Sequence, residues 1–299
     1  YMAHISNDRA AVIGGVNMDI GGSPFAKLVM RDSNPGVITA RPGGVGRNIA
    51  HDLRLLGLDV SLVTAVGGDV YGQGILSSCR ELGIDLSLAR IMPDMRSSTY
   101  LYVTDETGDM EIGIADMEIT SCITPAHIAA HMDALNSFGA VVLDANLSPE
   151  AIEYAAQSCT APLYADPVST AKAVRLLPVL DKLTAIKPNI YEAEKLTGEA
   201  DPERAARALI EKGVRRVFIS LGEEGMLAAE GDTLVRMPRE FVTVVNTTGA
   251  GDAATAAIVW AGLRGLGLEE SARAAVKAGA ITASCQGANN PALCAALLV

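Results

Sequence analysis

One aspartate follows a run of small residues at the start of a long apolar stretch. Residues 244–263 read VVNTTGAGDAATAAIVWAGL, with Gly249, Ala250, Gly251 and Asp252 in succession. The apolar stretch predicts a helix, whose first turn presents free N–H groups and the positive end of the helix dipole. Because small residues let an anion approach this backbone closely, the segment predicts an anion-binding helix start.

The carboxylate of Asp252 would point at whatever this helix start binds. A carboxylate beside a phosphate can accept the proton of an attacking hydroxyl, which is the task of a general base in phosphoryl transfer. An ordinary glycine-rich turn with an acidic residue in the first helical turn has the same sequence. This stretch alone does not separate the two interpretations, but it is not a Walker A loop, because G-x-x-x-x-G-K-[ST] is absent.

Two further segments combine glycines with short polar side chains. GGVNMDI, residues 14–20, supplies Asn17 and Asp19 after a predicted strand, where open α/β sheets bind ligands. RPGGVGRNIAHDL, residues 41–53, brings Asn48 to another glycine-rich helix start. A carboxylate can accept two hydroxyl groups while amides satisfy others, so the set suits a polyol. Each residue taken singly is also a common turn or cap residue.

Apolar runs that alternate with helical patterns must position these residues. Near-continuous apolar strands are typical of a parallel sheet covered on both faces. The predicted strands are residues 10–16, 59–67, 140–146, 161–167, 183–189 and 215–222. The predicted helices are residues 46–57, 71–83, 125–135, 148–158, 189–198 and 201–213. This alternation predicts a three-layer α/β/α sandwich with a mainly parallel central sheet.

Two segments interrupt the alternation and are predicted to form a small β lid. Residues 23–42 and 97–118 have the pattern of antiparallel hairpins, the second turning at DETGD. Hairpins cannot join a parallel ladder without leaving it, so we expect a separate sheet over the carboxyl ends of the strands. No linker or repeat divides the chain, which predicts a single domain over residues 1–299.

Composition excludes several classes of protein. The net charge is −11, from 35 acidic and 24 basic residues, which argues against binding to nucleic acid or to an anionic membrane. No apolar stretch approaches the roughly 20 residues of a membrane span, and YMAHISNDRA lacks an apolar signal core, so a cytoplasmic location is expected. The 5 cysteines contain no C-x-x-C pair and indicate neither a disulfide framework nor a zinc site.

Five motifs, taken together, resemble one family across nearly the whole chain. GGVNMDI, PGGVGRNIA, KPNIYEAE, ISLGEEG and NTTGAGDAATAAI occur in the order and spacing of the ribokinase-like (pfkB) carbohydrate and nucleoside kinases. The resemblance implies transfer of a phosphoryl group from ATP, with Mg²⁺, to a hydroxyl group of a small nucleoside or sugar.

The resemblance also implies a role for each matching residue. Asp252 would be the catalytic base, and Gly249, Ala250 and Gly251 the anion hole. Glu192 would serve the Mg²⁺ site. The residues implied in ATP binding are Asn189, Ser220, Gly222, Gly225 and Asn290. The residues implied in sugar binding are Asn17, Asp19, Gly44 and Asn48.

Within the family, three details favour pseudouridine as the acceptor of the phosphoryl group. They are NPG (34–36) leading into GGVGRN, DPVSTAK (166–172), and Asn246 before TTGAGD. The candidate residues for reading the base are Arg47, Thr99, Asp144 and Lys172. For Arg47 and Lys172, surface solvation and attraction of ATP phosphates remain open, because exposed Arg and Lys are common.

Departures from the family pattern and other functions are also open. Most ribokinases have Ala in place of Arg47 and Asp in place of Asn246; that Asp helps to coordinate a monovalent cation, so activation by K⁺ is in doubt. The alternatives are a ribokinase or another nucleoside kinase, a dinucleotide dehydrogenase, disfavoured because GGVNMD lacks G-x-G-x-x-G, and a non-catalytic sugar-binding protein. Lid edges could pair two chains into a homodimer.

Overall fold

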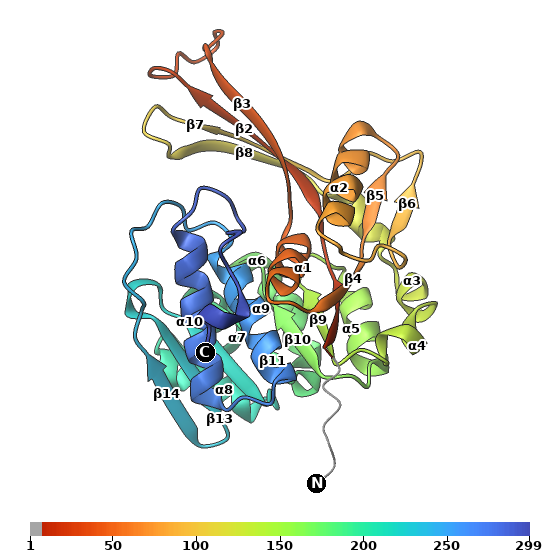
Figure 1. The fold of residues 1–299 in the computed structure, drawn as a ribbon, viewed down its shortest axis with the longest axis vertical. Helices are drawn as coiled ribbons and strands as arrows, with labels where there is room; N and C mark the ends of the chain where they lie inside the picture. The colour runs from red at the N-terminus through yellow and green to blue at the C-terminus, as the bar shows by residue number, and fades with distance from the viewer. Residues whose placement is uncertain (1–7) are drawn as a thin grey trace.

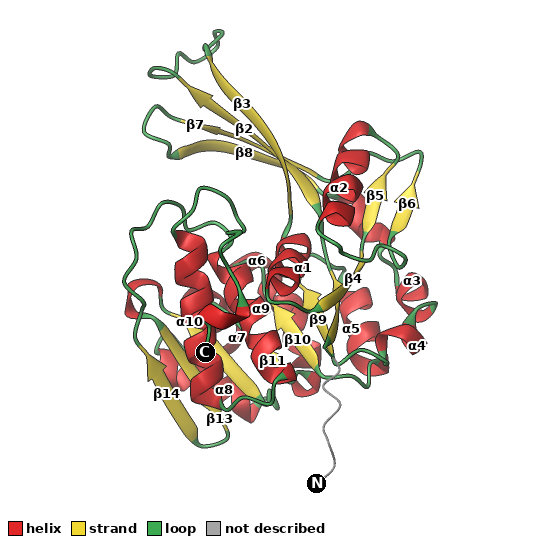
Figure 2. Cartoon of the chain, viewed as in Figure 1, coloured by secondary structure: helices red, strands yellow, loops and turns green. Residues whose placement is uncertain are grey.

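The central element is an eight-stranded sheet between two helical layers, seen in a computed structural model that describes residues 8–299 (Figures 1 and 2). The strand order is β14-β13-β12-β11-β10-β9-β1-β4, parallel from β12 to β4 and antiparallel at β13 and β14. The strands are β1 Arg9–Ile13, β4 Asp59–Val63, β9 Ala140–Asp144, β10 Leu163–Asp166, β11 Ala185–Ile186, β12 Arg216–Ser220, β13 Met226–Glu230 and β14 Thr233–Met237.

Alternate residues of each strand supply two hydrophobic cores, one on each face of the sheet. Ala10 and Val12 of β1 face one core, and Ala11 and Ile13 face the other. The first core is covered by α1 Val45–Leu55, α9 Ala250–Leu263 and α10 Leu268–Ala283. The second is covered by α3 Pro125–Ala129, α5 Pro149–Ser158, α7 Ile190–Thr197 and α8 Pro202–Glu211. The predicted three-layer α/β/α sandwich is confirmed.

The helix α9 is apolar on all sides, which explains its place in the middle of its layer. Every residue from Ala253 to Ala261 is buried, as expected for a helix with no polar face. The helix packs against α1 and α10 and reaches β10. Its first turn, residues 249–252, is partly exposed.

A second, four-stranded sheet forms the lid, at the top of Figure 1. Its order is β3-β2-β7-β8, with hairpins β2–β3 and β7–β8 joined by parallel pairing of β2 with β7. The bounds are β2 Asn17–Pro24, β3 Gly36–Gly43, β7 Thr99–Thr104 and β8 Met110–Asp116. The second predicted hairpin is found as expected. The first begins earlier than predicted, because Asn17 and Asp19 belong to β2.

Smaller elements differ from the sequence prediction. The predicted strand 59–67 divides at Thr64 into β4 and β5 Ala65–Gly67, which pairs with β6 Arg90–Met92 beside α2 Val70–Glu81. The predicted helix 125–135 divides into α3 and α4 Met132–Leu135. A short helix, α6 Thr170–Ala173, follows β10, and the antiparallel pair β13–β14 was not predicted. Among the described residues, no helix is both long and apolar enough to span a membrane.

Candidate active site

The start of α9 has the geometry of an anion-binding site. Gly249 is its N-cap, with φ of 83° in the left-handed region, and no side chain caps this end. A Cβ atom on Gly249 would lie 1.9 Å from the carbonyl oxygen of Ala288. Both the dihedral angle and the close contact therefore require glycine. The N–H group of Gly251 makes no hydrogen bond to a described residue and is available to an anion, whereas that of Ala250 donates to the carbonyl of Thr247 at 3.3 Å, against the sequence prediction that it is free.

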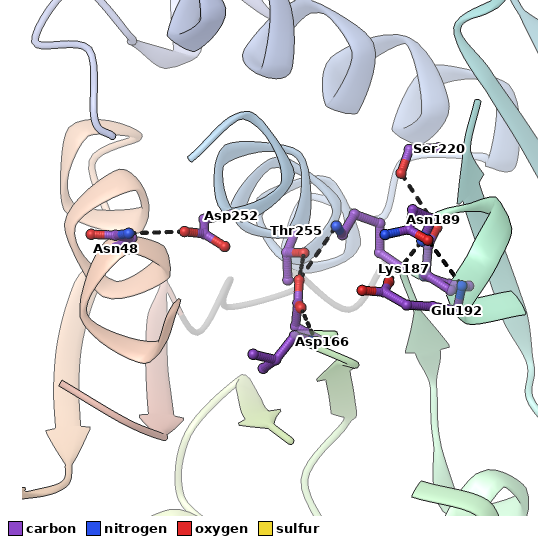
Figure 3. A network of polar contacts seen from close by, with 10 residues as sticks. Asn48, Asp166, Lys187, Asn189, Glu192, Ser220, Asp252 and Thr255 are labelled. Atoms are coloured by element: carbon purple, nitrogen blue, oxygen red, sulfur yellow. Dashed lines mark hydrogen bonds and ion pairs between the residues drawn. The ribbon is translucent and has the colours of Figure 1, made fainter. Parts of the chain in front are cut away.

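Asp252 lies in the first turn of α9 and faces α1. Asn48 donates a hydrogen bond from Nδ2 to Oδ2 of Asp252 at 2.9 Å (Figure 3). Burial raises the pKa of Asp252 to about 7, and the nearby carboxylates of Asp166 and Asp144 add to the shift. The hydrogen bond from Asn48 and the charge of Lys187 act in the opposite direction. A carboxylate with a pKa in this range is suited to accept a proton near neutral pH.

Lys187, which the sequence reasoning did not select, completes the charge balance at this helix start. It directly follows β11 and is only 7% exposed. Its Nζ lies 3.4 Å from Oδ2 of Asp166, which also accepts a 2.7 Å hydrogen bond from Thr255. A Cβ atom on Gly251 would lie 3.0 Å from the same Nζ. The ammonium group is therefore beside the anion-binding turn, as Figure 3 shows.

The surroundings keep Lys187 charged. Burial lowers the pKa of the ammonium group, but the carboxylates of Asp166, Glu192 and Asp252 raise it by more, and the net shift is upward. A charged residue directly after a buried strand, as in AIKPN, was the sequence signal for it. Such a residue is rarely buried unless it is paired.

Asn189 and Glu192 form a capping box at the start of α7. Oδ1 of Asn189 accepts from the N–H of Glu192 at 2.9 Å, and Oε2 of Glu192 accepts from the N–H of Asn189 at 2.8 Å. Glu192 is buried, and burial raises its pKa. Its second oxygen, Oε1, carries no hydrogen bond to a described residue. Within residues 8–299, no cluster of three His, Cys, Asp or Glu side chains could hold a metal ion.

The loop between β12 and β13 contains the other residues assigned to ATP. Ser220 ends β12, and its N–H donates to the carbonyl of Pro188 at 3.0 Å, next to Asn189. Gly222 and Gly225 have φ of 60° and 91°. A Cβ atom on Gly225 would lie 2.1 Å from the carbonyl oxygen of Met237. This loop therefore needs glycine for its course and lies beside the start of α7.

Asn290 is placed differently from the other residues assigned to ATP. Its Nδ2 donates to the carbonyl of Ile281 at 2.6 Å, and its Oδ1 accepts from the N–H of Ala292 at 3.0 Å. It is 8% exposed. The side chain thus caps the end of α10, and its assignment to ATP stays a prediction with no free polar group to support it.

The residues assigned to the sugar lie along β2 and the start of α1. Asn17 donates from Nδ2 to Oδ1 of Asp19 at 2.5 Å. Burial raises the pKa of Asp19, against the hydrogen bond from Asn17 and the charge of Arg47. Gly44 is the N-cap of α1 with φ of 99°. A Cβ atom on it would lie 2.7 Å from the backbone of Gly15 and of Val16. These contacts bring the lid strand and Asn48 together.

The four residues assigned to the base occupy different surroundings. Thr99 starts β7 and pairs with Met18 of β2. Asp144, at the end of β9, is fully buried and accepts from the N–H groups of Gly15 and Asn146 at 2.8 and 2.9 Å. Burial raises its pKa to about 6. These bonds fix the loops that follow β1 and β9, so both oxygens of this carboxylate are used to hold backbone in place.

Lys172 and Arg47 also have defined partners. Lys172, on α6, donates from Nζ to Oδ1 of Asn146 at 2.6 Å, and burial lowers its pKa. Arg47 is buried in α1 and donates to Ser78 and Asn289 at 3.1 and 3.0 Å. Simple solvation of Arg47 at the surface, an interpretation open from the sequence, is therefore wrong.

Asn246, before the glycine turn, joins two loops. Its Nδ2 donates to the carbonyl of Gln286 at 3.0 Å, and its Oδ1 accepts from the N–H of Thr248 at 3.0 Å. The amide thus supplies both a donor and an acceptor at this position. A carboxylate would supply only acceptors.

Comparison with known proteins gives one consistent result. The pfkB family carbohydrate kinase profile matches residues 7–294. Pseudouridine kinase from Escherichia coli (strain K12) is 36% identical over 96% of this chain and 94% of that protein. A carbohydrate kinase structure from Agrobacterium tumefaciens has a TM-score of 0.87 and 28% identity, covering 97% and 95% of the two chains. Ribokinase from Thermotoga maritima has a TM-score of 0.85 and 24% identity, covering 93% and 94%. The fold is ribokinase-like.

Replacing Gly249 by alanine tests the geometry of the helix start. Gly249→Ala should lower the free energy of unfolding by about 1–3 kcal/mol, because a non-glycine residue there is strained, and the contact with Ala288 should add to this loss. It should also lower kcat, because relief of the contact moves the N–H groups. Thermal unfolding and steady-state kinetics measure both effects.

Gly265→Ala is the matched control, because Gly265 ends the same helix with φ of 69° and no atom within 4 Å of an added Cβ. It should share the dihedral strain but leave kcat unchanged. Equal behaviour of the two variants would contradict the anion-site geometry.

Proposed function

Because this chain belongs to the pfkB family of carbohydrate kinases, we propose that it transfers the terminal phosphoryl group of ATP to the 5′-hydroxyl of pseudouridine. The coarser statement follows from family membership: the protein is a phosphotransferase that acts on an alcohol group of a sugar or nucleoside. Membership also excludes the dehydrogenase interpretation. The observation that carries the proposal is the contact of Asn48 with Asp252 at the anion-binding helix start.

Asp252 is the proposed general base. Its carboxylate lies in the first turn of α9, within reach of both an acceptor hydroxyl held by α1 and a phosphoryl group held by the helix N–H groups. It takes the proton of the 5′-hydroxyl as that oxygen attacks phosphorus. An intact base at this position argues against a non-catalytic binding protein.

The helix start and Lys187 are proposed to stabilise charge on the transferred phosphoryl group. The N–H group of Gly251 provides a donor in a fixed geometry, and the buried ammonium group of Lys187 provides a full positive charge beside it. Fixed donors in a site screened from water contribute most of the rate in phosphoryl transfer.

The surroundings of Glu192 fit Mg²⁺. This ion keeps several waters and binds through one or two carboxylates together with substrate phosphates, so a single buried carboxylate suffices. Glu192 offers Oε1, while its Oε2 is held by Asn189. Bound here with ATP, Mg²⁺ would neutralise charge on the phosphates. Asn189, Ser220, Gly222 and Gly225 are proposed to position the nucleotide.

On the acceptor side, Asp19 and Asn48 are proposed to hold the ribose. Asp19 is partly buried in β2 and would accept two hydroxyl hydrogen bonds, oriented by Asn17. Gly44 permits the close approach of this strand to α1. Because β2 belongs to the lid, movement of the lid would carry Asp19 with it.

Lys172 and Asn146 are proposed to read the base. Lys172 can donate to a carbonyl oxygen of uracil, and Oδ1 of Asn146 can accept from a ring N–H as well as from Lys172. Pseudouridine presents one ring N–H more than uridine, since its glycosidic bond is to carbon. A site that satisfies this donor can reject uridine strongly. Thr99, at the start of β7, is the further candidate on the lid.

Two finer points belong to the same proposal. The edge strands β3 and β8 of the lid expose Ile38, Ile112 and Ile114, and pairing of these edges would form a homodimer. Ribokinase activity, or activity on another nucleoside, is the second candidate within the family.

Asp252→Asn should lower kcat by at least about a hundredfold, because an amide cannot accept the proton. In the unaltered protein the carboxylate must be ionised, and its pKa is raised to about 7. Activity should therefore be full above that pH and fall as the pH drops through it. The residual rate of Asp252→Asn should not fall in this way as the pH drops. Calorimetry should show that ATP still binds to this variant. Near-normal turnover of this variant would remove Asp252 from its role.

Turnover should require no added K⁺, because Asn246 stands where most ribokinases have the Asp that helps to coordinate the cation, and its amide donates to the carbonyl of Gln286. Initial rates in K⁺ and in tetramethylammonium buffers should agree. Asn246→Asp is the matched variant, and its rate should become sensitive to K⁺, since a carboxylate cannot donate to that carbonyl. Strong K⁺ activation of the unaltered protein would contradict this expectation.

A substrate panel tests the acceptor. With MgATP, kcat/KM for pseudouridine should exceed that for uridine by more than about tenfold, and free ribose should be poorer than either. Adenosine and fructose complete the panel. Lys172→Met should raise KM for pseudouridine while leaving the low activity on ribose unchanged. Equal use of uridine and pseudouridine would indicate a general nucleoside kinase, and preference for ribose would reject the nucleoside assignment.

A further inference from the structure

A chain of polar contacts links Asp252, the proposed general base, to the carboxyl-terminal loop, residues 284–293. Asn289 of this loop donates from Nδ2 to the backbone carbonyl of Asn48 at 3.0 Å and to Oδ1 of Asp52 at 2.9 Å. Its Oδ1 accepts from Nη1 of Arg47 at 3.0 Å. One amide therefore uses its donors and its acceptor on three residues of α1. All three lie more than 200 positions away from Asn289 in the sequence.

The guanidinium group of Arg47 also faces the side chain of Asn48. The same Nη1 lies 3.4 Å from Oδ1 of Asn48. A guanidinium group has only donors, so the amide of Asn48 must turn its oxygen toward Arg47. Its NH₂ group is then directed to Asp252, where the 2.9 Å hydrogen bond is found. The orientation of an amide is thus specified by a neighbour that can only donate.

The charged side chains of Arg47 and Asp52 are buried, and burial of a charged group costs free energy. Arg47 is 7% exposed and Asp52 is fully buried. Nε of Arg47 and Oδ2 of Asp52 have no hydrogen-bond partner among the described residues. Buried polar groups left without partners destabilise a fold.

We propose that Arg47, held by Asn289, is a positioning residue that fixes the amide of Asn48 and so orients the carboxylate of Asp252 toward the acceptor hydroxyl. The inference rests on the role proposed for Asp252, and it does not depend on which nucleoside or sugar is the acceptor. Arg47 acts through Asn48. It differs from a residue that reads the nucleobase, which would change KM for the acceptor and leave kcat unchanged.

Arg47→Met is the test, with the best acceptor found in the substrate panel. It should lower kcat by about tenfold, the range for a hydrogen bond to a charged group, with KM for ATP little changed; KM for the acceptor should rise as well, because Asn48 is also proposed to hold the ribose. Asn289→Ala should lower kcat in the same way, and the double variant should be no slower than Arg47→Met alone. Arg47→Lys, which keeps the charge, should recover part of kcat.

The decisive comparison uses Asn48→Ala as a background. Single-turnover experiments at high enzyme concentration can measure rates far below the normal turnover number. The low rate of Asn48→Ala can therefore be measured. Arg47→Met should have almost no further effect there, because its effect passes through Asn48. An equal fall of the rate in both backgrounds would overturn the proposal, and so would an increase in acceptor KM at constant kcat.

Ser78→Ala is the matched control, because Ser78 accepts from Nη2 at the other end of the same guanidinium group. It should leave kcat unchanged. If instead Arg47→Met lowered only the unfolding temperature and left kcat intact, Arg47 would be structural and the proposal would be wrong. Normal turnover of Asp252→Asn would show that the role proposed for Asp252 is itself wrong, which is a separate outcome from failure of the role proposed for Arg47.

Discussion

The half-buried start of α9 is the constraint on which the rest of the site depends. The helix has no polar face, so it lies in the core from Ala253 to Ala261, and its half-buried first turn is where the core meets the surface. The turn has no side-chain cap, and Asp252 lies beside Asp166 and Asp144. Like charges in a buried site are unfavourable, and the ammonium group of Lys187 offsets them. Burial, together with the remaining imbalance of charge, raises the pKa of Asp252, which suits it to act as a base.

The same constraint explains the glycines and the buried amides around this turn. Gly249 allows the carboxyl-terminal loop to approach the helix start, and Gly44 allows the lid strand to approach α1. Asn48 and Asn289 then satisfy groups that would otherwise be buried without partners. An amide is useful here because it can donate and accept at once, which neither a carboxylate nor an ammonium group can do.

Two residues proposed to hold the acceptor belong to the lid sheet, whereas the proposed general base, Asp252, lies on helix α9 against the central sheet. Parallel pairing of β2 with β7 joins two hairpins into one sheet, and β2 carries Asn17 and Asp19. Asp144, Asp166 and Lys187 lie at or directly after the carboxyl ends of β9, β10 and β11, in the central sheet. This is the edge at which open α/β sheets bind ligands. Phosphoryl transfer thus depends on how two sheets are held relative to each other.

The sequence by itself determined the layers, the second hairpin of the lid and the helix start at Gly249, because each follows from local periodicity or backbone freedom. The pair β13–β14 could have been found, since Gly231 and Asp232 form a typical tight turn between two apolar runs. The placement of Asn17 in a lid strand could not, because a short polar segment after a strand looks the same as a loop. Only the tertiary structure brought Lys187 to the glycine turn, turned Asn290 toward α10 and buried Arg47 against Asn289. Those contacts join residues far apart in the chain, and spacing along a sequence carries no information about which side chains a fold brings within hydrogen-bond distance.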